Sequence, residues 1–129
     1  RIRRSRTPIG VLLMDQSAIA GLGNIYRAEL LWLHRIHPKT HGEAVPPTAL
    51  RKIWRDAARL MDLAVETGRI ITRIDYPDDR PPAKLTKRQR FNIYKLEKCP
   101  RCRSPITRFT QAGRTVYACE DCQKVSLKE

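Results

Sequence analysis

Four cysteines, arranged as two Cys-x-x-Cys pairs, constrain the fold of this chain more than any other feature of its sequence. Cys99 and Cys102 form the first pair, Cys119 and Cys122 form the second, and sixteen residues separate the pairs. Each pair can present two thiolates to one ion from a tight turn, and a hairpin between them would close a tetrahedral site. The spacing predicts one structural zinc ion (Zn2+), because four sulfur ligands leave no open position for a catalytic water.

Two other uses of these cysteines are less well supported. Disulfides suit secreted proteins, and no sustained apolar leader follows the basic first residues. A redox-active pair normally opens a helix in a βαβ unit, and no such unit is predicted before Cys99. The neighbours of the pairs favour the thiolate forms that a metal binds. These basic neighbours are Lys98, Arg101, Arg103 and Lys124.

Upstream of the cysteines, helix signals dominate. Thr7 followed by Pro8 suits the start of a helix, and glycines at positions 21 and 68 suit helix ends. Asn24 is a good N-cap for the apolar segment that follows it. The expected elements are a short helix over residues 8–14, a helical turn over residues 16–20, a helix over residues 25–36 and an amphipathic helix over residues 47–67.

The rest of the sequence predicts a linker and a small hairpin. Residues 69–90 are proline-rich and charged, which indicates a flexible basic linker. Beyond them, apolar and polar residues alternate on both sides of the turn Gln111-Ala112-Gly113. The expected fold class is therefore mainly α with a small β-hairpin zinc finger, a four-cysteine zinc ribbon. If the ribbon is a separate module, loss of the metal should unfold residues 91–124 and spare the helices.

The balance of charge indicates a polyanionic partner. The 129 residues include 26 lysines and arginines against 13 aspartates and glutamates, for a formal net charge of +13. These cations gather within residues 1–6, 84–90 and 101–114, as phosphate binding requires, so nucleic acid is expected. A membrane is not expected, because the longest apolar run, residues 11–14, is far too short to cross one.

The turn before the second long helix is a candidate phosphate site. Gly21 and Gly23 expose backbone N–H groups, and the helix N-terminus after Asn24 adds further donors. Asn24 can equally be a plain N-cap, and both roles can hold together. The other large or titratable side chains before the cysteines are given no functional role. Met14, Trp32 and Trp54 are expected in the core, and His34, His37 and His41 receive no role because they lack metal-ligand spacing.

Taken together, these motifs resemble those of the formamidopyrimidine-DNA glycosylase and endonuclease VIII family. The run from Met14 to Pro38, with Gly21-Leu22-Gly23-Asn24 inside it, is similar to the family's helix–two-turn–helix module. Residues 90–95, the two cysteine pairs and residues 113–123 resemble the family's C-terminal zinc-finger hairpin. The two motifs stand in the family's order and spacing and bracket nearly the whole chain. The resemblance implies a DNA-binding module in residues 1–68, the linker in 69–90 and the zinc finger in 91–129.

The resemblance implies base-excision repair. Family members are DNA glycosylases and AP lyases in which an N-terminal proline amine attacks the glycosidic bond of a flipped-out oxidised base, and the Schiff base then allows strand cleavage. The family places that proline, with a neighbouring glutamate, in an N-terminal domain that would precede Arg1. The chain is therefore expected to be the DNA-binding half, inactive alone. Its expected partners are damaged DNA and the missing catalytic domain. A monomer, and a cytoplasmic, nucleoid-associated location in a bacterial cell, are also expected.

The same resemblance assigns DNA contacts. Asn24 and Arg114 match the asparagine and arginine with which the family grips phosphates beside the extruded nucleotide. An arginine at a hairpin tip offers a planar fork of donors to a phosphate. The full expected set of DNA-contacting residues is Asn24, Arg114, Gly21, Gly23 and Lys95.

Departures from the family pattern bear on the substrate. Residues 69–95 lack both the glycine-rich loop and the Tyr-Gly-Arg sequence of the formamidopyrimidine enzymes. Residues 91–95 look closer to the endonuclease VIII branch, which favours oxidised pyrimidines over 8-oxoguanine. Two other functions stay open at this point: a non-catalytic zinc-ribbon module that only binds nucleic acid, and a protein-interaction ribbon.

Overall fold

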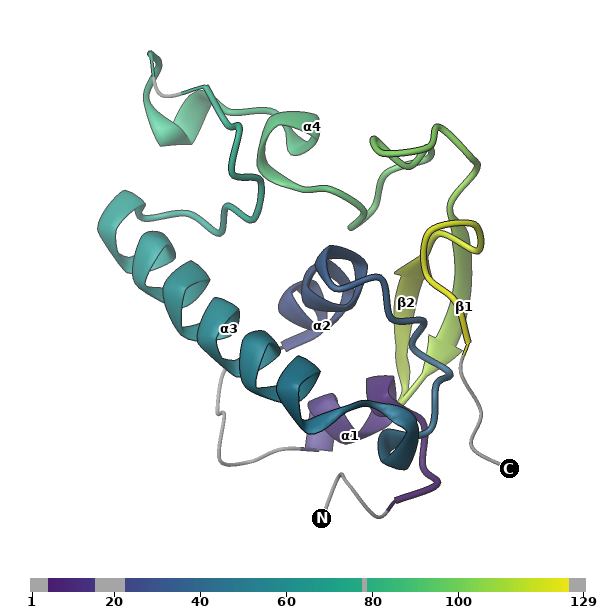
Figure 1. Ribbon diagram of the computed structural model, residues 1–129. Coiled ribbons are helices and arrows are strands. Elements are labelled where there is room, and N and C mark those ends of the chain that lie inside the picture. The colour runs from purple at the N-terminus through teal and green to yellow at the C-terminus, as the bar shows by residue number, and fades with distance from the viewer. Residues whose placement is uncertain (1–4, 16–22, 78, 126–129) are drawn as a thin grey trace.

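Helix α2 is the element against which most of the fold packs. The computed structural model describes residues 5–15, 23–77 and 79–125. In Figure 1, α2 lies at the centre, with α3 along one side, the hairpin of β1 and β2 on the other and α1 below. The α-helices are α1 (Ile9–Asp15), α2 (Gly23–Leu33), α3 (Pro47–Thr67) and α4 (Lys87–Arg90), the 3-10 turns are η3 (Gly42–Ala44) and η4 (Pro82–Lys84), and the strands are β1 (Thr107–Gln111) and β2 (Arg114–Ala118).

The mainly helical fold class with a two-stranded antiparallel hairpin is confirmed. Helix α3 has the bounds expected from its sequence, because both ends carry strong signals. Pro47 occupies the first turn, where its missing N–H costs nothing. Gly68 closes the helix with a left-handed φ of 79°, and its N–H donates to the Ala64 carbonyl.

Helix α2 departs from the expected range of 25–36 at both ends. It begins at Gly23, so Asn24 lies within its first turn and the predicted N-cap role is wrong. It ends at Leu33 because Arg35 adopts a left-handed φ of 58°, after which Ile36 forms a parallel bridge with Lys124. The helical turn expected over residues 16–20, and Gly21, lie outside the described residues.

The hairpin turns through two residues, as its sequence predicts. Gln111 pairs with Arg114 at the last rung, and Ala112 and Gly113 adopt φ values of 55° and 76°. Two consecutive left-handed residues make the turn whose twist matches that of the flanking strands. This places Arg114 directly after the tip of the hairpin.

Two apolar clusters lie on opposite faces of α2. The first joins α1, α2 and α3 and includes the fully buried Leu30, Leu31 and Ile53. The second joins Ala28 and Trp32 of α2 to the hairpin and to three of the four cysteines. The core placement of Trp32 is confirmed, and Trp54 packs half-buried against the first cluster. Because α2 belongs to both clusters, the helices and the cysteine-bearing hairpin share one interior.

Several described residues of the segment 69–90, which was expected to be a flexible linker, make specific contacts. Ile71 and Thr72 are fully buried, and the N–H of Thr72 donates to the Arg90 carbonyl at 2.8 Å. The Arg69 guanidinium donates to three carbonyls near η4, and Thr86 and Gln89 form a capping box at α4. The segment is thus packed on the helices, while the division into three parts stays a prediction.

Among the described helices, none combines the length and the apolar character needed to span a bilayer.

Candidate metal centre and nucleic-acid interface

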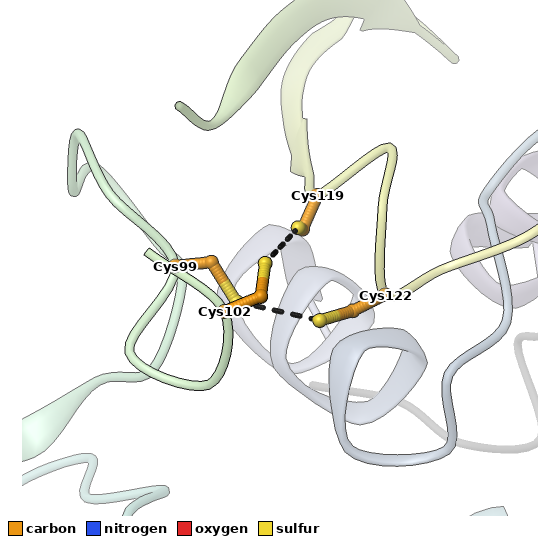
Figure 2. Close-up of side chains that lie close together, drawn as sticks. All are labelled: Cys99, Cys102, Cys119 and Cys122. Atoms are coloured by element: carbon orange, nitrogen blue, oxygen red, sulfur yellow. Dashed lines mark hydrogen bonds between the residues drawn. The ribbon is translucent and has the colours of Figure 1, made fainter. Parts of the chain in front are cut away.

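The four cysteine sulfurs converge at one point, as Figure 2 shows. Cys99 and Cys102 lie on the loop before β1, and Cys119 and Cys122 follow β2. All four Sγ atoms lie within 4.8 Å of one another, with 3.8 Å between Cys99 and Cys122 and 3.3 Å between Cys102 and Cys119. A tetrahedral zinc ion with Zn–S bonds of about 2.3 Å needs sulfurs about 3.8 Å apart. The ligand set therefore fits zinc, and the predicted structural zinc site is confirmed.

The protonation of these thiols differs strongly between exposed and buried positions. Hydrogen bonds from Ser104 lower the pKa of the exposed Cys102 thiol to about 6. Burial raises the pKa of Cys119 to about 12 and also raises that of Cys122. The indole N–H of Trp32 donates to the Cys99 sulfur at 3.2 Å, an outer contact that orients this metal ligand. A bound cation supplies the charge that lets the buried thiols ionise, so metal binding releases protons and weakens as the pH falls.

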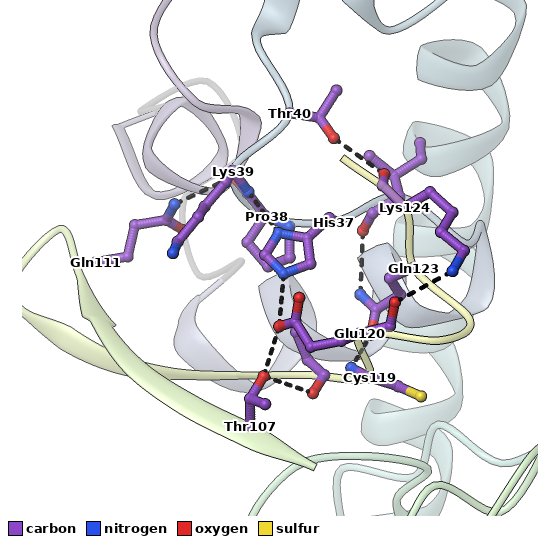
Figure 3. A network of polar contacts seen from close by, with 12 residues as sticks. His37, Pro38, Lys39, Thr40, Thr107, Gln111, Cys119, Glu120, Gln123 and Lys124 are labelled. Atoms are coloured by element: carbon purple, nitrogen blue, oxygen red, sulfur yellow. Dashed lines mark hydrogen bonds and ion pairs between the residues drawn. The ribbon is translucent and has the colours of Figure 1, made fainter. Parts of the chain in front are cut away.

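A buried histidine connects the chain after α2 to the loop of residues 119–122, which carries the second cysteine pair, as Figure 3 shows. His37 is 1% exposed, and its Nε2 lies 2.9 Å from the Glu120 carboxylate, which also accepts from Thr107. The N–H of Lys39 donates to Nδ1, so the ring proton is assigned to Nε2. The ring stacks on Phe109 with centroids 5.8 Å apart. Sequence reasoning gave His37 no role for want of metal-ligand spacing, and local spacing could not reveal these contacts because the partners lie about 70 to 80 residues away in the chain.

Gln123 makes a second tie between the same two regions. Its side-chain oxygen accepts from the Cys119 N–H at 2.7 Å, and its amide donates to the Ile36 carbonyl at 3.0 Å. The same side chain therefore holds the backbone of the zinc ligand Cys119 and the backbone of Ile36, which follows α2. Such outer contacts orient the ligands of a metal site and resist its distortion.

A polar network connects the start of α2 to the hairpin tip. Arg27 is fully buried and donates to the carbonyls of Gly10 and Gln111 at 3.2 and 3.0 Å, and also to the side-chain oxygen of Asn24. The amide of Asn24 donates to the Thr115 carbonyl at 2.7 Å. Gly10 permits this approach, because a Cβ there would stand 1.8 Å from the Gln111 side-chain oxygen. The network sets the position of the hairpin tip relative to α1 and α2.

Positive charge gathers at this corner of the molecule. The pKa of Arg27 is lowered to about 10, first by burial and then by the nearby positive charge of Arg114. Arg114 itself is exposed. The N-terminus of α2 adds the positive end of its dipole. Asn24 and Gly23 therefore share one corner with Arg114, which lies far from them in the sequence, and that corner suits an anion.

Lys95 belongs to a different part of the surface. It follows the Ile93–Tyr94 segment, has a left-handed φ of 57° and lines a groove with Arg73 and Lys87. The structure thus groups Asn24, Gly23 and Arg114 and separates Lys95 from them.

A buried carboxylate anchors the segment that carries Lys95. Glu29 of α2 is fully buried and accepts five hydrogen bonds from two parts of the chain. An ionised carboxylate can only accept, and every partner here is a donor. The pKa of Arg73 is raised chiefly by its hydrogen bond to Asp75, with a smaller contribution from the Glu29 charge. The five donors are the Thr72 hydroxyl, the Asn92 side-chain amide and the backbone N–H groups of Asn92, Ile93 and Tyr94.

Comparison with known proteins gives matches to the helical part of the chain and to the part that carries the four cysteines. A family model described as the formamidopyrimidine-DNA glycosylase H2TH domain matches residues 1–75, and one described as a zinc finger found in FPG and IleRS matches residues 97–125. Endonuclease 8 1 of Mycobacterium tuberculosis (strain ATCC 25618 / H37Rv) is 40% identical over 125 residues, which are 95% of this chain and 47% of that protein. The formamidopyrimidine-DNA glycosylase of Chloroflexus aurantiacus is 38% identical over 125 residues, which cover 95% of this chain and 44% of that protein.

The similar solved structures include proteins of the same family bound to DNA. The crystal structure of Lactococcus lactis Fpg with abasic-site DNA superposes with a TM-score of 0.74 and 27% identity, over 95% of this chain and 44% of that one. The structure of MutM with DNA containing carbocyclic 8-oxo-G gives the same TM-score and identity, over 95% of this chain and 43% of that one. The chain thus spans about half the length of the relatives that it matches.

Proposed function

The chain belongs to the formamidopyrimidine-DNA glycosylase and endonuclease VIII family, and from this premise we propose that it is the DNA-binding part of a bifunctional DNA glycosylase and AP lyase. The observation that carries the proposal is the positive corner formed by the α2 N-terminus and the hairpin tip. Arg114 presents a planar fork of donors there, while Asn24 and Arg27 hold the hairpin in place. The similar Fpg structure contains DNA with an abasic site, which supports damaged DNA as the ligand.

We expect Arg114→Ala to weaken binding to a duplex with a tetrahydrofuran abasic analogue by about 10- to 100-fold, the worth of one charge-assisted, bidentate phosphate contact. Fluorescence anisotropy at fixed salt measures the loss. Arg51→Ala is the matched control, because it removes the same charge from an exposed position on α3. Equal affinities of the two variants would remove Arg114 from the DNA site, provided that both retain zinc and helical content.

Catalysis requires a nucleophile that we place outside this chain. The relatives extend over about twice its length, and the family resemblance puts the proline nucleophile in their N-terminal part. The chain alone should therefore neither cleave an abasic-site duplex nor form a covalent adduct with it when borohydride is added to trap a Schiff base. An adduct detected on a denaturing gel would mean that a lysine or the amino terminus of this chain serves as the nucleophile.

We further propose that oxidised pyrimidines are preferred over 8-oxoguanine. Residues 69–95 support this, since they lack a glycine-rich loop and instead form short turns and α4. Excision rates on duplexes with an oxidised pyrimidine or with 8-oxoguanine, measured on a protein that joins this chain to an N-terminal catalytic domain, decide the question. Faster removal of 8-oxoguanine would reverse the assignment.

A non-catalytic nucleic-acid module is the second candidate. The matching zinc-finger model covers FPG and IleRS proteins alike, so the finger by itself does not specify repair. Such a module should bind lesion-free duplex as tightly as the abasic duplex. A preference for the abasic duplex would exclude it.

A further inference from the structure

A basic groove lies on the molecule away from the Arg114 corner. It has a volume of about 770 Å³ and is lined by α4, by Arg73 and by the loop that leads into the metal site. In Figure 1, α4 and that loop stand at the top, whereas the hairpin turn points down toward α1. The charged lining residues are six cations and one carboxylate: Arg73, Lys87, Arg88, Lys95, Lys98, Arg103 and Glu97.

Most of these cations are available to a ligand. Arg73 is paired, since its guanidinium makes two 2.8 Å contacts with the Asp75 carboxylate. The side chains of Lys87, Arg88, Lys98 and Arg103 are exposed and make no hydrogen bond or ion pair with any described residue. Like charges held around one groove, where they outnumber the carboxylates, create a strong local field for a polyanion.

Fixed elements hold the groove in shape. Arg73 donates to the Arg88 carbonyl at 3.0 Å, and Arg90 donates to the Ile70 carbonyl at 3.0 Å. Next to the lining residues Cys99 and Pro100, Arg101 lies 3.8 Å over the Trp32 ring and donates to the Trp32 carbonyl. The groove thus stands beside the C-terminal end of α2, whereas Asn24 and Arg114 stand at its N-terminal end.

We propose that this groove binds phosphates of the DNA duplex that flanks the lesion, and so forms a second contact site beyond the Arg114 corner. The inference rests on the proposed function. The two ends of the eleven-residue α2 lie about 15 Å apart at 1.5 Å per residue, and one site stands beside each end. A duplex rises about 3.4 Å per base pair, so the groove lies about four or five base pairs from the first site.

The test compares duplexes of two lengths, about 9 and about 21 base pairs, each with a central tetrahydrofuran abasic analogue; the shorter one ends before it can fill the groove. The variant K87Q/R88Q/K98Q of the zinc-loaded chain removes three groove cations and leaves Lys95 and the zinc ligands unchanged. The matched control R51Q/K52Q/R55Q removes three exposed cations from α3. Affinities are measured by anisotropy across a salt series.

On the long duplex, the groove variant should bind about 10- to 100-fold more weakly at low salt, and its salt slope should fall by about 0.9 for each lost contact. Its affinity for the short duplex, and the affinities of the control for both, should stay close to wild type. Equal losses on both duplexes, or equal losses in the control, would overturn the inference. The inference would also be overturned if the affinity of the wild-type chain did not rise with duplex length. The groove would then be assigned to an acidic protein partner. Failure of the proposed function is distinct, because the wild-type chain would then not prefer the abasic duplex at either length.

Discussion

Chelation of the zinc ion is expected to unfold α2 together with the hairpin, rather than the hairpin alone. Ala28 and Trp32 of α2 share a core with Cys99, Cys119 and Cys122, and the Trp32 indole donates to the Cys99 sulfur. Structural zinc contributes about 10–16 kcal/mol in small fingers, which is comparable to the whole stability of a domain, about 5–15 kcal/mol. The shared core therefore changes the expectation, based on sequence alone, that the helices survive metal loss.

Tryptophan fluorescence separates these two outcomes. The chain has two tryptophans, Trp32 beside the metal site and Trp54 on α3. In a Trp54→Phe background, a chelator should shift the Trp32 emission to the red and lower the helical circular dichroism, and Cys119→Ser should do the same without chelator. Unchanged Trp32 emission after complete zinc removal would show that the hairpin unfolds independently.

The second large effect is expected from Glu29→Gln, which should lower the free energy of unfolding by about 3 kcal/mol. The glutamine side chain has nearly the same shape, but one end carries N–H donors. One end of the carboxylate now accepts from Ile93 and Tyr94, and the other from Thr72 and Asn92, so a donor would face a donor at either end. Buried donors without partners cost about 1–3 kcal/mol each. Urea unfolding of the zinc-loaded chain measures the change.

Glu97→Gln is the control for Glu29→Gln, because Glu97 is exposed. Surface substitutions of this kind usually change stability by less than about 0.5 kcal/mol. Two variants within 1 kcal/mol of each other would mean that the carboxylate of Glu29 is not required to hold residues 91–94, and that the packing of Phe91 and Ile93 suffices.

The sequence predicted those parts of the fold that are determined by residues close together in the chain. The proline and glycine at its ends fixed the range of α3, the Ala112-Gly113 turn fixed the hairpin, and the cysteine spacing predicted the metal site. Helix α2 was misjudged because its boundaries depend on distant contacts. Its apolar run continues past Leu33, but the bridge between Ile36 and Lys124 draws the chain away from the helix axis.

The buried polar groups could not be predicted for the same reason. Arg27 and Glu29 stand in an apolar helix, and charged residues are rarely buried unless they find partners. Those partners are brought in from α1, the hairpin and the residue 91–94 segment, so no pattern of spacing near α2 reveals them. At the proposed DNA site, the family resemblance of the sequence indicated Arg114 and Asn24 but not the Arg27 network that positions the hairpin tip beside Asn24.

The tie between Gln123, Lys124 and the residues after α2 has a consequence for how the protein is made. A ribosome releases α2 roughly ninety residues before these partners emerge, so one face of the helix stays uncovered while those residues are made. Contacts so distant along the chain also slow the closure of the fold. Nascent chains stalled before Cys119 should therefore be protease-sensitive throughout α2, and protection should arise only when the last cysteine pair has left the exit tunnel and captured its metal.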